Sequence, residues 1–102
     1  MSDVRNPRPK FDLGQIVATP GALEALRDSD QGPSEFLARH AVGDWGDLDE
    51  EDRRLNDLAL ANGSRFLSAF VTSKGERLWA ITEAVGDDGR RASTCLLLPS
   101  EY

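Results

Sequence analysis

The sequence predicts an α+β fold, in which two or three N-terminal helices pack on a C-terminal meander of three antiparallel strands. Up to Gly63, apolar residues recur at helical spacing between capping residues. After Gly63, three extended runs rich in aromatic and β-branched residues alternate with short turns. The chain has 102 residues, of which 39% are hydrophobic and 29% charged, proportions that suit one globular core. We therefore expect a single domain over residues 11–102.

The helices are predicted from their start and stop signals. Thr19 can cap a first turn that opens with Pro20, and Gly63 supplies a left-handed stop for the last helix. These signals place helices near residues 20–28, 33–41 and 49–61.

Apolar spacing predicts which helix faces are buried. Leu23 and Leu26 are expected to share the buried face of the first helix, and Leu55, Leu58 and Ala59 to mark that of the third.

The strands are predicted from extended runs bounded by turn residues. They are expected near residues 65–72, 77–84 and 91–98, where the turns contain Gly, Asp, Ser or Lys. The middle run is largely apolar at both odd and even positions, so the helices should cover at least one face of the sheet. Residues 15–18 form a further short strand, which is a candidate fourth member of the sheet.

Charge divides the chain into a basic arm and an acidic body. Residues 1–10 contain three cations against Asp3, which gives +2, so the total of −6 leaves −8 for residues 11–102. With two prolines and little to bury, residues 1–10 are expected to be a flexible arm. The acidic body disfavours direct nucleic-acid binding and favours a partner protein with a basic surface.

Nothing in the sequence resembles a membrane span or a secretory leader, so we expect no membrane association and a cytoplasmic location. Cys95 is the only cysteine, which excludes an internal disulfide. No glycine spacing matches a phosphate-binding loop, and no cofactor is expected.

A resemblance to a known family rests on five strings of the sequence, FDLGQIVATPGALEAL, FLARHAVGDWGDLDEEDRRLND, FLSAF, ERLWAITEA and LLLPSEY. Together they resemble a family of small bacterial proteins carried on plasmids and other mobile elements, labelled plasmid-related proteins. The likeness runs from Phe11 to Tyr102, with a longer link at residues 86–90 as its one departure. It implies a mobile-element setting and carries over no catalytic residue.

The segment from His40 to Asp47 is the most chemically loaded part of the sequence. It contains the only histidine, the carboxylates of Asp44 and Asp47, and the indole of Trp45. Imidazole and carboxylate groups can bind a metal or share a proton, but the paired spacing of a zinc motif is absent. Three interpretations stay open for this segment: a structural corner, a partner-binding loop, or a metal or catalytic site.

The following helix start is strongly acidic. Asp49, Glu50 and Glu51 lie where carboxylates favour the positive end of a helix dipole. They are either a solvated helix start or an acidic docking surface that imitates phosphates and attracts arginines and lysines.

The sequence thus predicts a small acidic, non-enzymatic interaction protein that binds another protein. The resemblance implies a setting in mobile genetic elements, where an anti-defence or regulatory role would fit. The alternative is a small enzyme or metal-dependent site around His40, Asp44 and Asp47.

Overall fold

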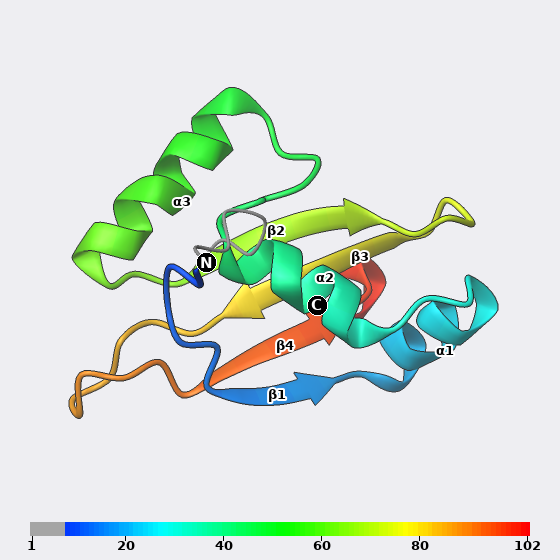
Figure 1. Cartoon of the computed structure of the whole chain (residues 1–102), viewed down its shortest axis with the longest axis horizontal. Helices are drawn as coiled ribbons and strands as arrows, with labels where there is room; N and C mark the ends of the chain where they lie inside the picture. The colour runs from blue at the N-terminus through cyan, green and yellow to red at the C-terminus, as the bar shows by residue number, and fades with distance from the viewer. Residues whose placement is uncertain (1–7) are drawn as a thin grey trace, which may run out of the picture.

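A computed structural model describes residues 8–102 and has a four-stranded mixed sheet with three α-helices (Figure 1). In chain order the elements are β1 (Gln15–Ala18), α1 (Pro20–Asp28), α2 (Pro33–Ala41), α3 (Glu50–Asn62), β2 (Phe66–Val71), β3 (Arg77–Thr82), β4 (Ser93–Leu97) and a short 3-10 helix, η1 (Pro99–Glu101). The predicted α+β class and the positions of the helices and strands are confirmed.

The fourth strand is also confirmed, and it completes the sheet on the β4 side. The strand order is β1-β4-β3-β2, so β1 and β2 are the two edges. β1 runs parallel to β4, with Gln15 opposite Ser93, whereas the pairs β4–β3 and β3–β2 are antiparallel.

Capping residues define the ends of α1 and α3, and Thr19 and Gly63 do so as the sequence predicts. Thr19 Oγ1 accepts a hydrogen bond from the Ala22 amide at 3.2 Å, and Asp49 Oδ1 accepts one from the Asp52 amide at 2.8 Å. Gly63 ends α3 with a φ of 82°, a left-handed conformation that costs glycine little. Local chemistry therefore fixes where these helices begin and end.

The main core lies between the sheet and the helices α1 and α2, which cover one of its faces (Figure 1). Phe36 of α2 packs there with Phe70 of β2, Leu78 of β3 and Leu96 of β4, and all four are fully buried. A second cluster, formed by Trp45, Ala59 and Phe66, lies beneath α3.

Two predictions about helix faces are wrong in part. Leu26 of α1 is buried as predicted, but Leu23 is 44% exposed, and Ala22 and Ala25 complete the buried face. Ala59 of α3 is also buried as predicted, whereas Leu55 and Leu58 are each 54% exposed.

The position of α3 explains the second difference. This helix lies beside the edge strand β2 and does not cross the sheet (Figure 1). It therefore buries only Asn56 and Ala59, and its leucine side faces outward.

Within residues 8–102, no helix combines the length and hydrophobicity that a membrane crossing requires. The predicted basic arm lies outside the described residues except for residues 8–10. There the Lys10 amide donates a hydrogen bond to the Ala41 carbonyl at 2.7 Å.

Candidate interaction site

The loop around Trp45 is a packed corner that covers the outer edge of β2. The Ala69 amide donates to the Trp45 carbonyl at 3.0 Å, and the Asp47 amide donates to the Ala69 carbonyl at 2.6 Å. Trp45 is 4% exposed, and its indole N–H donates to Asp57 at 3.0 Å. A side chain at Gly46 would place its Cβ 2.1 Å from the Ala69 carbonyl oxygen, so only glycine fits here. The structural-corner interpretation of this loop accounts for all of these contacts.

His40 is fully buried and joins a chain of polar side chains that crosses the core. Its Nδ1 lies 2.5 Å from Ser68 Oγ, and its Nε2 lies 2.7 Å from Thr82 Oγ1. Thr82 Oγ1 is in turn 2.7 Å from Thr94 Oγ1, which donates to the Leu13 carbonyl at 2.7 Å. We call these five residues the polar relay.

The carbonyl at one end of the polar relay fixes the direction of every bond in it. A carbonyl oxygen only accepts, so the Thr94 hydroxyl donates its hydrogen to the Leu13 carbonyl and must accept a hydrogen bond from Thr82. Thr82 then has no proton left for the ring, so His40 Nε2 carries the hydrogen and donates to it. Nδ1 is therefore the acceptor, and it receives the hydroxyl hydrogen of Ser68. The neutral Nε2–H tautomer satisfies every member of the chain.

The surroundings of the ring keep it neutral. Phe11, Trp45 and Phe66 surround the imidazole with ring centroids 5.2, 5.7 and 5.5 Å away. Burial lowers the pKa of His40 from 6.5 to about 4, because the charged form would lose its hydration. Both ring nitrogens are thus occupied by hydroxyl groups, and the side chain has no exposed surface.

The two aspartates of the predicted constellation point to other partners. Asp44 Oδ2 pairs with Arg39 Nε at 2.7 Å, and this hydrogen bond lowers the pKa of the Asp44 carboxyl. Asp47 lies 3.9 Å from Arg77 at the surface. Across residues 8–102, no three His, Cys, Asp or Glu side chains group in a way that could hold a metal ion. His40, Asp44 and Asp47 therefore form no shared site in this fold.

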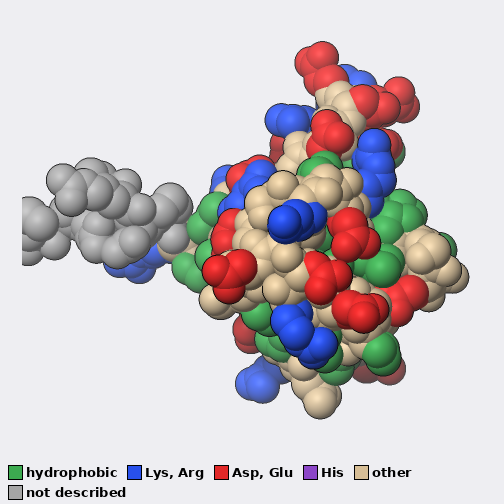
Figure 2. Space-filling view, turned by 90° about the vertical axis from the view of Figure 1, so that its right-hand side faces the viewer, with side chains coloured by type: hydrophobic (Ala, Val, Ile, Leu, Met, Phe, Trp, Pro, Cys, Tyr) green, Lys and Arg blue, Asp and Glu red, His purple; other side chains and the backbone are tan. Residues whose placement is uncertain are grey.

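The acidic start of α3 is exposed to solvent. Asp49, Glu50, Glu51 and Asp52 are exposed, and the two ion pairs found among the described residues involve none of them. Figure 2 shows acidic side chains gathered at the top of the molecule, where α3 begins. Arg53, the nearest cation in sequence, donates instead to the carbonyls of Leu48 and Gly46.

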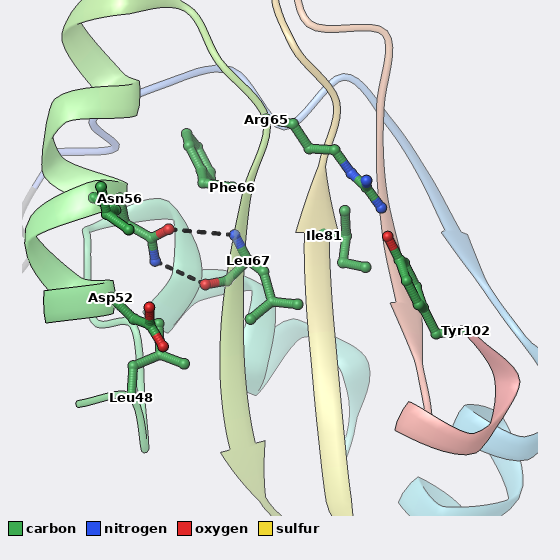
Figure 3. A pocket seen from close by; sticks show the side chains of 9 residues that line it. Leu48, Asp52, Asn56, Arg65, Phe66, Leu67, Ile81 and Tyr102 are labelled. Carbon is green, nitrogen blue, oxygen red and sulfur yellow. Dashed lines mark hydrogen bonds between the residues drawn. The ribbon is translucent and has the colours of Figure 1, made fainter.

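A hollow of about 350 Å³ lies directly beside this acidic start, between α3 and the sheet face that α1 and α2 leave uncovered (Figure 3). We call it the α3 groove. Its lining is mostly apolar, with an acidic rim at α3 and an aromatic and basic rim opposite, and comprises Leu48, Asp52, Leu55, Asn56, Arg65, Phe66, Leu67, Ile81 and Tyr102.

The two rims of the α3 groove have different chemistry. Asp52 belongs both to the acidic start and to the lining, so the two features are continuous. On the opposite side, the Arg65 guanidinium lies 5.4 Å from the ring centroid of Tyr102 (Figure 3).

Asn56 holds the α3 groove in shape. Its side-chain amide donates to the Leu67 carbonyl at 2.7 Å and accepts from the Leu67 amide at 3.5 Å, as the dashed lines of Figure 3 show. The helix is thereby fixed against the edge of β2 at a distance that leaves its leucine side uncovered.

Of the predicted binding residues, Asp49, Glu50 and Glu51 lie at the start of α3, directly before Asp52 of the groove lining, and His40 and Trp45 lie in the core. Sequence reasoning missed the apolar lining itself. The signal that could have revealed it is the apolar character of both faces of β3.

Comparison of the chain with protein-family models, with curated proteins and with solved structures finds no match in any of the three. The α3 groove and its acidic rim are therefore judged on their chemistry alone.

Proposed function

We propose that the protein is a non-enzymatic interaction protein that binds a basic segment of another protein at the α3 groove. The observation that carries the proposal is the continuity between four exposed carboxylates, which form no ion pair within residues 8–102, and an apolar hollow of about 350 Å³. A solvated helix start needs no hollow beside it, whereas a docking surface needs both an apolar anchor and polar complementarity at its rim.

The chemistry of the expected partner follows from the two parts of the site. An apolar side chain of the partner enters the hollow and contacts Leu55, Leu67 and Ile81, which removes apolar surface from water. Lysine or arginine side chains beside it meet Glu51 and Asp52, and their charge speeds the encounter. A protein that binds nucleic acid contacts the phosphates with lysine and arginine side chains. The carboxylates of the acidic rim can imitate those phosphates, so such a protein is a suitable partner.

The sequence resemblance to plasmid-related proteins supplies the setting for this proposal. In that setting, a small acidic protein that occupies a basic surface of a host or defence protein would block it by competition. Anti-defence or regulatory roles both fit such a mechanism.

The test is affinity capture from a bacterial host extract, with captured proteins identified by mass spectrometry. Glu50→Gln with Glu51→Gln removes two charges at the acidic rim, and Leu55→Ser removes an exposed apolar contact. Each variant is expected to lose the same captured protein, and capture by the wild type should weaken as salt is raised.

A matched control removes two charges elsewhere. Asp87→Asn with Asp88→Asn lies in the exposed β3–β4 turn, and asparagine keeps the acceptor that binds the Arg90 amide. This control should capture the partner as the wild type does. Equal capture by the wild type and both groove variants would refute the proposal.

A further inference from the structure

The two edges of the sheet differ in whether their outward-facing backbone groups have hydrogen-bond partners. Along β2, the backbone groups of Leu67 are paired with the Asn56 side chain, and those of Ala69 with the Trp45–Asp47 corner. Proteins protect edge strands in such ways because an open edge can accept a further strand. The β2 edge is therefore closed to pairing at two successive outward-facing residues.

In the part of the chain that the structure describes, nothing protects the β1 edge in a comparable way. The amides of Gln15 and Thr19 donate inward, to the β4 side of the strand, at 2.9 Å each. Because backbone direction alternates along a strand, the N–H and C=O groups of Ile16 and Ala18 point outward. Within residues 8–102, β1 pairs with β4 alone.

The side chains of β1 also suit pairing. Ile16 and Val17 are 43% and 41% exposed, on opposite faces of the strand. The strand QIVA contains no charge and no proline, which are common means of blocking an edge.

We infer that β1 is a self-association edge, which pairs antiparallel with β1 of a second copy of this chain to form a continuous eight-stranded sheet. The distribution of charge suits a second copy at this edge, because it keeps the repulsion between two acidic bodies small. The acidic start of α3 lies at the opposite edge, next to β2, so two copies joined through β1 keep their acidic regions at the far ends of the joint sheet (Figure 1). The uncharged strand places no like charges opposite one another.

The outward groups determine the register of this pair. Two-fold symmetry with Ile16 opposite Ala18 of the second copy satisfies all the outward N–H and C=O groups of these two residues. Val17 then meets Val17 of the second copy on the axis, as a non-hydrogen-bonded pair with Cα atoms about 4.5 Å apart. Because each strand has only four residues, the interface is small and the dimer should form reversibly with concentration.

Sedimentation velocity over a concentration series tests the inference. The wild type is expected to shift from monomer to dimer, and Ile16→Pro should remain a monomer. Proline at this position removes an outward N–H and no hydrogen bond to β4, so the monomer should keep its circular dichroism spectrum. Leu58→Ser, an exposed apolar change on α3, is the matched control and should dimerise as the wild type does.

A cross-linking variant reports the register even if the proline variant fails to fold. Val17→Cys is made together with Cys95→Ser, because Val17 lies opposite Cys95 in the β1–β4 pair and the two thiols could otherwise join within one chain. A Cα separation of about 4.5 Å permits a disulfide across the two-fold axis. Mild oxidation should therefore give a covalent dimer, whereas Gln15→Cys in the same background should cross-link poorly.

Several results would overturn the inference. A wild type that stays monomeric throughout, or a dimer that Leu58→Ser abolishes, would show that β1 does not self-associate. Dimers that form only after removal of residues 1–7 would show that this segment of the chain already occupies the edge. The inference is independent of the proposed function, because Glu50→Gln with Glu51→Gln should leave the dimer unchanged.

Discussion

Acidification should weaken the fold through His40 in a pH range that can be stated in advance. The pKa of His40 is lowered from 6.5 to about 4 in the native protein, whereas in the unfolded chain it returns to its ordinary value. Above pH 6.5 both states hold a neutral imidazole. Between pH 6.5 and about 4 the imidazole is protonated in the unfolded chain but stays neutral in the native protein. The free energy of unfolding therefore falls as the pH falls.

The size of the loss follows from the same two values. The difference between 6.5 and about 4 corresponds to about 3 kcal/mol at 25 °C. That is a large part of the roughly 5–15 kcal/mol by which a domain of this size is stable. Asp44 adds to the loss of stability at lower pH. Its pKa lies below the ordinary value of 3.8, so its ion pair with Arg39 is lost only when the carboxyl is protonated below that value.

The assay is urea unfolding, followed by tryptophan fluorescence at steps between about pH 7 and about pH 4.5. His40→Gln is the control: it should be less stable than the wild type at neutral pH and show a much flatter dependence on pH. The titration of His40 can also be followed directly by NMR, since the only histidine of the chain gives one set of imidazole signals in tag-free protein. An imidazole that titrates near pH 6.5, or a wild type as flat as the control, would refute the reasoning.

Three further predictions follow from the same contacts. Thr82→Val should cost about 1–3 kcal/mol in urea unfolding, because it leaves the buried Nε2–H without an acceptor, whereas Thr82→Ser keeps the hydroxyl and should cost less; equal losses would contradict a stabilising hydrogen bond between Thr82 and His40. Gly46→Ala should destabilise far more than Gly75→Ala in thermal unfolding, because both positions have positive φ but only the first Cβ meets a backbone oxygen; similar shifts would contradict the packed corner. Protein purified without added metal should show metal only at background level by mass spectrometry, and stoichiometric zinc or manganese would revive the site around His40.

Local chemistry made most of the fold predictable. Thr19, Asp49 and Gly63 act through neighbours three or four residues away, so their roles are legible without knowledge of the rest of the chain. The strands were predictable for a similar reason, since turn residues interrupt runs of alternating side chains. Helix and strand positions therefore came directly from the sequence.

The α3 groove was not predictable, because it depends on where α3 lies relative to the sheet. Leu55 and Leu58 have the spacing of a buried face, but the pairing of Asn56 with the edge of β2 places α3 so that this face points outward. An asparagine in a helix gives no sign of such a role in the sequence.

The polar relay left a faint signal. Ser68, Thr82 and Thr94 are polar residues at inward-facing positions of three largely apolar strands, and the chain has one histidine to join them. Connecting them required the strand register, in which Thr82 and Thr94 are direct partners. Arg91 shows the same limit: it is buried and donates to the carbonyls of Ala59 and Glu83, and no sequence pattern marks it.

The pairing of β1 with β4 has a consequence for how the chain acquires its fold during synthesis. The hydrogen bond from Thr94 to Leu13 joins residues 81 positions apart, and β1 has β4 as its only partner in the described sheet. On a ribosome that adds about 5–20 residues per second, β1 therefore waits several seconds without a neighbour. The three helices can form in that interval, but the sheet closes only when β4 emerges. Until then both edges of the segment QIVA are unpaired in the nascent chain. Chaperones that bind extended apolar segments would therefore find a target there.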